Sequence, residues 1–345
     1  MTVTAAPSSL VPRAGGAAGR AAGALVLSLD FELHWGVFDV LAPDGPYRPN
    51  LLGARRAVPA MLDVFAERGV AATWATVGLL MARSRAEAMR LSPSPALRPA
   101  YRDPRLSAYG VPVGEGEEDD PLHYAPSLVR RIADTPGQEL ATHSFSHFYC
   151  QEPGQTRAAF AADLAAAVEA ARPYGVPMRS FVFPRNQHNP EYDGVLREAG
   201  IVAFRGNARG WIHRPMGVAR EWRVLRGVRR LDAYVPLSGR QTWRWSALRP
   251  RDGMSNVPAS LLLRPALPGA PALDGLSLRR AQAAVVAAAR AGRVVHLWWH
   301  PHNFGANLNA NLGRLRALLD TYAACRARWG MQSLTMAQAA EVAAA

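Results

Sequence analysis

The sequence contains no lysine, only two cysteines and no long apolar run. All 40 of its basic residues are arginine, against 27 acidic residues, and the formal net charge is +13. Cys150 and Cys325 lie far apart and provide no disulfide framework. No segment approaches the roughly 20 apolar residues that a membrane-spanning helix requires. These absences argue against a disulfide-stapled secreted domain and against a membrane span, and they favour a cytoplasmic protein.

The first 23 residues are rich in alanine, glycine, serine and proline and include two arginines. They lack the compact apolar segment that follows a basic start in secretory signals. We therefore expect residues 1–23 to form a disordered leader ahead of the folded part.

The arginines are dispersed along the chain, with small local groups such as Arg226, Arg229 and Arg230. Nucleic-acid binding requires clustered basic residues on a recognisable module, so we expect no nucleic-acid partner. A GC-rich genome would favour both arginine and alanine codons without any functional reason. Arginine also suits carboxylates and phosphates, which leaves an acidic or nucleotide-linked sugar open as a ligand.

Strand-like and helix-like segments alternate along the chain. The expected strands are 24–30, 70–77, 138–142, 180–184, 201–204 and 293–299. The expected helices are 54–68, 127–134, 155–172, 190–199, 276–291 and 307–328. This alternation predicts a parallel sheet and an α/β architecture. We expect one domain over residues 24–340, with irregular insertions around 83–126 and 206–271.

Two short motifs carry the chemistry. Asp30 and Glu32 end the first expected strand, and strand alternation makes them point the same way. His143 and His147 follow the third expected strand and would share a face if their segment is helical. Three of these four groups could hold a Zn²⁺-like ion with one position open, and the fourth could move protons. The combination predicts metal-assisted hydrolysis.

In the same order along the chain, these segments resemble the motifs of the NodB-homology polysaccharide deacetylases, carbohydrate esterase family four. The histidine motif at 143–147 is the most specific match, and 70–78 is similar to the family's second strand. The resemblance runs from about Leu25 to Leu334. It implies an α/β fold, a distorted and incomplete (β/α) barrel of about seven parallel strands with loop insertions.

The resemblance also assigns roles to the two motifs. Asp30 matches the family's catalytic base, and Glu32, His143 and His147 match its metal ligands. The usual family pattern has two adjacent aspartates and then glycine, whereas here the second carboxylate is a glutamate one residue further on. The implied cofactor is one divalent metal, with Zn²⁺ expected first and Co²⁺, Ni²⁺ or Fe²⁺ as alternatives.

Two later motifs complete the catalytic set. Arg185 falls where the family places an arginine that pairs with the base, so we expect it to contact Asp30, although here proline precedes the arginine. His300 closes the last strand, where the family carries its catalytic acid. An imidazole there could protonate a leaving amine near neutral pH, and His296 and His302 are its nearby alternatives.

Weaker candidates surround these motifs. Substrate contacts are expected from His34, Trp35, Asn186 and Asn303. A tryptophan at this position could stack on a sugar ring, although a buried aromatic is the commoner outcome. Asn303 and Asp232 are also candidates for orienting the catalytic histidine.

The resemblance implies removal of an N-acetyl group from an acetylated amino sugar or glycoconjugate, including an anionic one. Hydrolysis of another non-peptide amide, imide or ester on the same fold is the alternative enzymatic interpretation. A non-catalytic carbohydrate-binding relative is the third, and such a protein would be expected to lack the base or a metal ligand.

Overall fold

The computed structural model describes residues 21–213, 223–239, 241–267 and 269–345. Residues 1–20, the greater part of the leader expected over 1–23, lie outside the described residues. No helix within the described ranges is both long and apolar enough to cross a bilayer.

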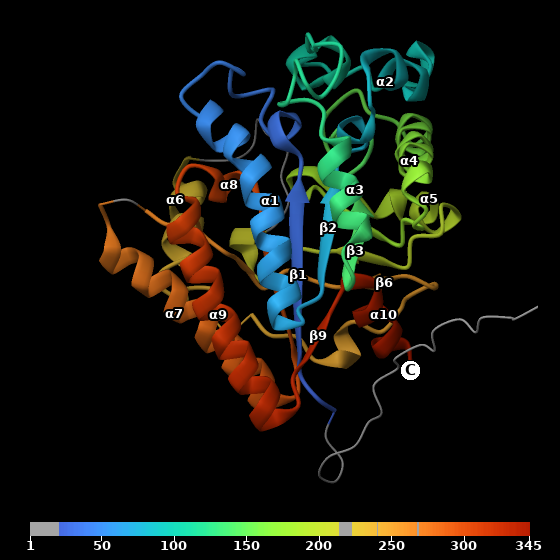
Figure 1. Cartoon of the computed structure of the whole chain (residues 1–345). Helices are drawn as coiled ribbons and strands as arrows, with labels where there is room; N and C mark the ends of the chain where they lie inside the picture. Colours follow the sequence, from blue (N-terminus) through green and yellow to red (C-terminus); the bar gives the residue numbers. More distant parts are fainter. Residues whose placement is uncertain (1–20, 214–222, 240, 268) are drawn as a thin grey trace, which may run out of the picture.

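A parallel sheet forms the centre of the molecule (Figure 1). Its strands are β1 (Ala24–Phe31), β2 (Ala72–Thr76), β3 (Gln138–Thr142), β4 (Ser180–Val182), β5 (Ala203–Arg205), β6 (Ser255–Asn256), β7 (Leu261–Leu262), β8 (Val294–Trp299) and β9 (Gln332–Leu334). The order is β6-β5-β4-β3-β2-β1-β8-β7, and β9 pairs with the beginning of β1. Three strands, β6, β7 and β9, were not expected, because they have two or three residues and lie outside the longer apolar segments that indicated the other strands.

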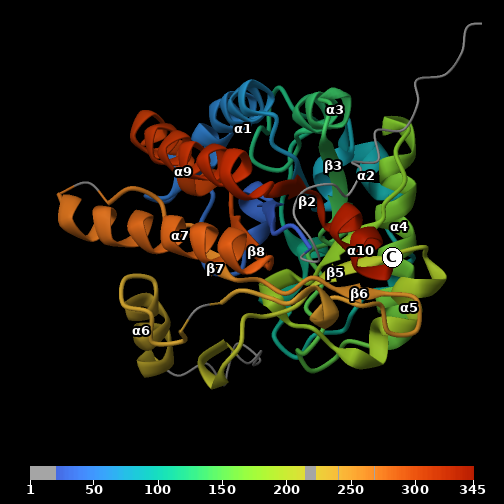
Figure 2. The same ribbon diagram turned by 90° about the horizontal axis from the view of Figure 1, so that it is seen from below.

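The sheet curls into an incomplete barrel whose two open ends are β6 and β7. Among the described residues these two short strands pair with β5 and β8 and not with each other. Helices surround the strands, as the view from below shows (Figure 2). The expected distorted and incomplete (β/α) barrel is confirmed.

The helices are α1 (Arg48–Arg68), α2 (Arg85–Leu91), α3 (Pro126–Asp134), α4 (Arg157–Ala171), α5 (Asp193–Glu198), α6 (Arg223–Asp232), α7 (Pro271–Ala291), α8 (His302–Gly305), α9 (Leu308–Trp329) and α10 (Met336–Ala344). The helices α1 and α7 start earlier than expected, each with a proline in its first turn. Both end at a glycine in the left-handed conformation, Gly69 and Gly292.

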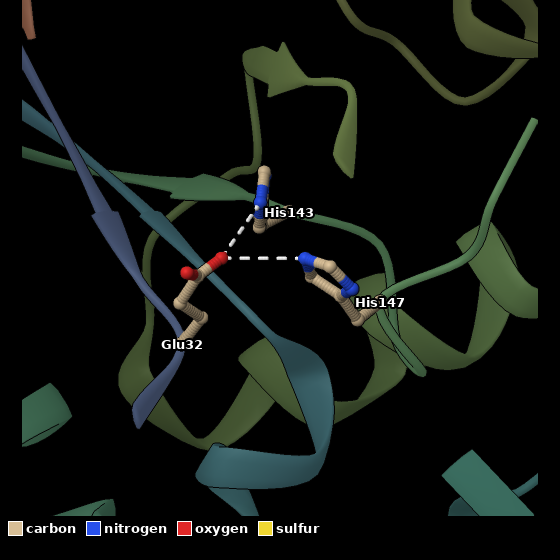
Figure 3. A group of neighbouring side chains, drawn as sticks. All are labelled: Glu32, His143 and His147. Carbon is tan, nitrogen blue, oxygen red and sulfur yellow. Dashed lines mark ion pairs between the residues drawn. The ribbon is translucent and has the colours of Figure 1, made fainter. Parts of the chain in front are cut away.

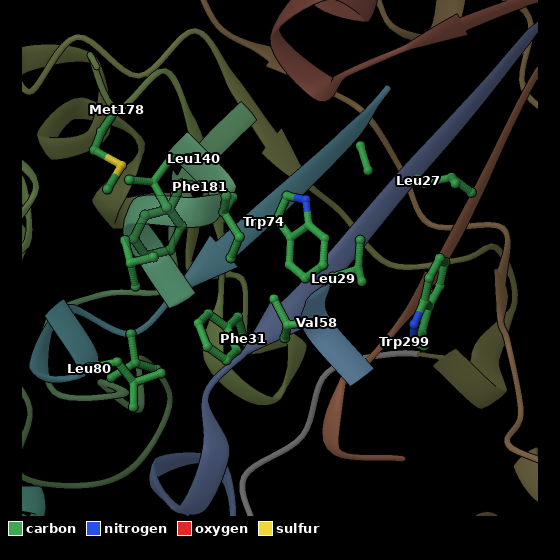
Figure 4. Packing of buried hydrophobic residues seen from close by; sticks show 14 of the residues in the cluster. Leu27, Leu29, Phe31, Val58, Trp74, Leu80, Leu140, Met178, Phe181 and Trp299 are labelled. Atoms are coloured by element: carbon green, nitrogen blue, oxygen red, sulfur yellow. The ribbon is translucent and has the colours of Figure 1, made fainter. Parts of the chain in front are cut away.

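Strand alternation sorts the buried side chains into two layers. On β1, Leu25, Leu27, Leu29 and Phe31 point outward into the main core against the helices (Figure 4). The alternate residues point into the barrel, where Ala24, Val26, Val294 and Ala203 form a smaller cluster with Met336, Ala339, Ala340 and Ala343 of α10. The barrel interior is therefore apolar at its lower end, which α10 closes.

The two expected insertions contain short elements. Residues 83–126 include α2 and the 3₁₀ turns η3 (Pro95–Leu97), η4 (Pro104–Leu106) and η5 (Ala108–Gly110). Residues 206–271 include α6, η11 (Trp245–Ala247), β6 and β7. This second segment supplies the rim of the barrel between β5 and β8, beside the site described next.

Candidate active site

The inward face of β1 changes from apolar to polar along its length. Val26 lies in the interior cluster, and Ser28, Asp30 and then Glu32 follow on that face. Asp30 and Glu32 are each only 3% exposed. Parallel strands deliver their end residues to one edge of a barrel, so these carboxylates meet side chains from β3, β5 and β8.

The loop after β3 supplies two histidines. Residues 143–147 are not helical, so a shared helix face does not bring His143 and His147 together. Instead Ser144 and His147 take positive φ values of 62° and 56°, and the tight turn brings the two imidazoles to a centroid distance of 5.2 Å. Backbone in this region is costly for non-glycine residues and persists where the surroundings enforce it.

Asp163 on α4 enforces the shape of this loop. Its buried carboxylate accepts hydrogen bonds from the N–H groups of Phe145 and Ser146, at 2.7 and 3.1 Å, and from the Ser146 hydroxyl. Burial raises the pKa of Asp163 to about 6, although these donors favour the charged form. The placement of both histidines therefore depends on one buried acidic group of the neighbouring helix.

Glu32, His143 and His147 converge on one point (Figure 3). The Glu32 Oε2 atom lies 3.2 Å from His143 Nε2 and 3.3 Å from His147 Nε2. The His143 Nδ1 atom lies 2.8 Å from the carbonyl oxygen of Val182, which can only accept, so Nδ1 carries the hydrogen. A neutral His143 ring then presents a lone pair to a carboxylate oxygen, an arrangement that requires a proton or a cation between them.

This donor set fits a divalent cation. Two ligands bound tetrahedrally at about 2.1 Å are separated by about 3.3–3.4 Å, which matches both Glu32–histidine distances. One oxygen and two imidazole nitrogens would leave the fourth position of a tetrahedral site open. The hydrogen bond from His143 Nδ1 to the Val182 carbonyl fixes the orientation of the His143 ring, as is usual for histidines that bind a metal. Burial would raise the pKa of Glu32, but His300, His143 and His147 outweigh it and hold that pKa well below its usual range.

Arg205, at the end of β5, is the partner of Asp30. Its two terminal nitrogens donate to the two carboxylate oxygens at 2.6 and 2.7 Å, and both side chains are buried. Arg205 also donates to Ser28 Oγ at 3.0 Å and to Asn186 Oδ1 at 3.1 Å. Burial would raise the pKa of Asp30, but the charge of Arg205 outweighs it and lowers that pKa, so Asp30 is ionised.

The expected contact between Arg185 and Asp30 is wrong. Arg185 donates to both oxygens of Asp39, at 2.7 and 2.5 Å, and lies over the Tyr149 ring. The loop after β4 passes through left-handed backbone at Arg185, with φ of 52°, which directs the side chain to the segment following β1. Both oxygens of Asp30 are already occupied by Arg205.

His300 follows β8 and faces the two carboxylates from the β8 side of β1, whereas His143 and His147 approach from the β3 side. Its Nε2 atom lies 3.4 Å from Glu32 Oε1 and 3.7 Å from Asp30 Oδ2, and its side chain is 23% exposed. Asn303 contacts the other ring nitrogen at 3.3 Å and accepts a hydrogen bond from the Tyr47 hydroxyl at 2.8 Å. Asn303 therefore lies behind His300 and orients its ring.

The two alternative histidines are buried. His296 contacts the carbonyl of Val257 at 2.9 Å and the Ser28 hydroxyl at 2.8 Å, and burial lowers its pKa to about 3. Burial likewise lowers the pKa of His302 to about 3. Both rings are therefore neutral near pH 7. Of the three candidates, His300 is the one that reaches both carboxylates and stays partly exposed.

The weaker substrate candidates divide into two groups. His34 is buried, and its two ring nitrogens contact His123 Nε2 at 2.8 Å and the carbonyl of Leu41 at 2.9 Å. Trp35 is also buried, and its indole N–H donates to the His123 carbonyl. Both residues anchor the turn after β1, and their expected contact with substrate stays a prediction. Asn186 lines an adjoining cavity of about 360 Å³.

Sequence reasoning missed several residues that build the site. The most important is Arg205, because the expected strand 201–204 stopped one residue short of it. Ala203 points into the barrel and Phe204 outward, so one more step of alternation would have placed an arginine inside. Asp163 and Tyr47 carry no local signal, since each acts on a loop that is distant in the sequence.

Comparison with known proteins supplies independent information. The family model described as polysaccharide deacetylase matches residues 43–204, a range that contains both histidines of the cluster but neither Glu32 nor the Asp30–Arg205 pair. No curated protein matches the chain.

Solved structures share the fold at low sequence identity. A candidate polysaccharide deacetylase from Mycobacterium smegmatis is 17% identical with a TM-score of 0.60, and the match covers 97% of this chain and 95% of that one. A second candidate from Pseudomonas aeruginosa PAO1 is 11% identical, with a TM-score of 0.51 and coverages of 92% and 89%. PuuE allantoinase is 11% identical, with a TM-score of 0.53 and coverages of 92% and 88%.

The incomplete parallel barrel, the histidine motif after β3 and the match over residues 43–204 agree with one another. Residues 43–204 match the polysaccharide deacetylase family, and the chain shares the fold of solved structures described as candidate polysaccharide deacetylases.

Proposed function

We propose that the chain is a metal-dependent hydrolase that removes an N-acetyl group from an acetylated amino sugar or glycoconjugate. The observation that carries the proposal is the convergence of Glu32, His143 and His147 beside an ionised, arginine-paired Asp30. Zn²⁺ suits one carboxylate and two imidazoles, and Co²⁺, Ni²⁺ and Fe²⁺ suit them as well. A divalent cation bound there would polarise the acyl carbonyl and lower the pKa of a coordinated water.

The chain's own residues would move the protons. Asp30 is ionised and held in one orientation by the two hydrogen bonds from Arg205, so it can accept the proton of the attacking water. His300 lies on the other side of the cluster, within 3.4 Å of Glu32 and partly exposed, where it can protonate the departing amine. Asn303 supports the His300 ring from behind. The products would be a free amine and acetate.

The proposal is tested by metal analysis together with acetate release from a panel of acetylated amino sugars. We expect one divalent metal per chain and acetate release from at least one substrate. The variant His143→Ala should lose the metal almost completely. The variant Asp30→Asn should keep the metal and lose about 10²–10⁴-fold in turnover, the usual effect of removing a general base.

Two results would redirect the proposal. Hydrolysis of allantoin or of simple esters without acetate release from any sugar would favour the alternative reaction on the same fold. A metal-loaded protein that binds acetylated sugars and hydrolyses none of the panel would favour the non-catalytic interpretation. Loss of metal from Asp30→Asn would make Asp30 a ligand.

A further inference from the structure

The cavity beside the active site carries an excess of positive charge. Its described lining includes Arg185, Arg229, Arg264 and Arg280, and among these described lining residues Asp232 is the one carboxylate. Several guanidinium groups around a concave, partly enclosed space create a potential that attracts anions. Arg185 is paired with Asp39, which lies outside the lining, and the other three arginines come from α6, from the segment after β7 and from α7.

Arg280 on α7 is the best-defined member of this group. Its side chain is only 9% exposed, and one terminal nitrogen donates to Asp232 at 3.1 Å and to Ser238 at 3.3 Å. The other terminal nitrogen is buried and has no hydrogen-bond partner among the described residues. A buried guanidinium N–H without an acceptor is costly, and a ligand oxygen in the cavity would satisfy it.

The carboxylate of Asp232 is already fully engaged. It accepts hydrogen bonds from the backbone N–H of Ser238 at 2.7 Å and from the Ser238 hydroxyl at 2.9 Å, in addition to that from Arg280. His213 lies 3.6 Å from the same carboxylate. Asp232 is thus shared by several donors and contacts one terminal nitrogen of Arg280, which leaves the other terminal nitrogen of Arg280 facing no acceptor among the described residues.

Two residues that line the cavity also contact the catalytic residues. Trp298 lines it, lies 4.3 Å from the Arg205 guanidinium and has its ring centroid 5.5 Å from that of His300. Asn186 also lines it and accepts a hydrogen bond from Arg205. A molecule in the cavity would therefore be separated from the Asp30–Arg205 pair by the side chains of Trp298 and Asn186.

We infer that the substrate carries an anionic oxygen group, a phosphate or a carboxylate, which this cavity binds through Arg280 while the acylated nitrogen lies at the Glu32–His143–His147 cluster. The inference rests on the proposed function and narrows its substrate class to acidic or phosphorylated sugar derivatives. The planar fork of arginine suits both kinds of oxyanion. The volume of about 360 Å³ lies within the about 300–1,000 Å³ typical of small-molecule sites.

The test measures binding of probes that have no acyl group, so it does not depend on hydrolysis. Isothermal titration calorimetry is performed with inorganic phosphate, glucose 1-phosphate, glucose 6-phosphate, glucuronate and neutral glucose. Both metal-loaded and chelator-treated protein are used, because a bound metal also attracts anions. We expect at least one anionic probe to bind both forms, more tightly than glucose, with an affinity that falls as salt is added. Comparing the affinities of the phosphate probes with that of glucuronate shows whether the cavity prefers a phosphate or a carboxylate group.

Two variants on one helix make the test specific. Arg280→Gln should weaken binding of the anionic probe by about 10- to 100-fold, the usual value of a charge-assisted hydrogen bond. Arg279→Gln removes the same charge from the next residue, which is exposed and outside the described cavity lining, and should leave the affinity unchanged. Arg280→Lys keeps the charge but lacks the planar guanidinium, so its affinity for the probe should lie between those of Arg280→Gln and Arg279→Gln. This variant provides a second measurement if Arg280→Gln fails to fold.

The inference is overturned if no anionic probe binds the chelator-treated protein, or if Arg280→Gln and Arg279→Gln bind the probe equally well. It is also overturned if binding is confined to the metal-loaded form, because the anion would then lie at the metal cluster. Failure of the proposed function looks different: the protein would release no acetate while the arginine-dependent binding of the probe persisted.

Discussion

Replacing Arg205 with glutamine removes the buried cation that faces Asp30. In the native protein two hydrogen bonds of 2.6 and 2.7 Å hold this carboxylate, and both partners are buried. Without the guanidinium, burial dominates and favours the protonated acid, which cannot accept a proton from water. We therefore expect kcat to fall by about 10²–10³-fold, within the range for loss of a general base.

The same substitution also destabilises the fold. Removing one partner of a buried ion pair costs about 3–5 kcal/mol, because the remaining carboxyl must either stay charged without a partner or take up a proton. For a chain of this length that loss lowers Tm by a few degrees to about 10 °C, so activity is compared well below the transition. Arg205→Lys keeps the charge but cannot form both bonds of the fork, and should lose less of both kcat and stability.

The assay is acetate release at saturating substrate, with metal content measured on the same samples. Arg185→Gln serves as the control, since Arg185 pairs with Asp39 and leaves Asp30 untouched, so its kcat should fall far less. The reasoning is refuted if Arg205→Gln retains native kcat while folded. Loss of metal from Arg205→Gln would show instead that the pair supports Glu32.

Three further changes test other parts of the structure. His300→Ala should retain the metal and reduce amide hydrolysis more than hydrolysis of 4-nitrophenyl acetate, whose leaving group needs no proton, and equal losses would exclude it as the acid. The folded-state pKa of Asp163 is raised from 3.8 to about 6, so its contribution to stability is present below about pH 4 and lost as the pH rises through 6. In urea titrations of chelator-treated protein, the unfolding free energy of wild type relative to Asp163→Asn should therefore gain about 3 kcal/mol between about pH 7 and pH 4, and a pH-independent difference would contradict this. A Cβ atom at Gly53 would lie 2.5 Å from the backbone of Gly305, so Gly53→Ala should destabilise the α1–α8 contact by roughly 1–3 kcal/mol in a thermal melt. The matched change Gly313→Ala, at an exposed position of α9 with open space around it, should be neutral or stabilising by up to about 1 kcal/mol. Equal effects of the two glycine changes would show that the close approach is not real.

Local pattern was enough to predict most of the architecture. Alternating strand and helix signals predicted the α/β fold because each pattern reflects the burial of one segment against the sheet. The carboxylates after β1, the histidines after β3 and His300 after β8 could be predicted together, because parallel strands bring their carboxyl ends to one edge. The two-residue strands β6 and β7 could not be predicted, because their pairing depends on the neighbouring strands β5 and β8 and not on a pattern of their own.

The tertiary structure alone decided which groups touch. Arg185 follows β4 and Arg205 ends the neighbouring strand β5; alternation along β5 places Arg205 inside the barrel, but only the packed structure shows that it reaches Asp30. The choice depends on whether the residue points into the barrel and on the turn of the following loop: Arg205 is still on the inward face of β5, whereas Arg185 is already in left-handed backbone. Contacts of this kind join residues far apart in the chain, so strand register and loop shape determine them, and both are properties of the packed molecule.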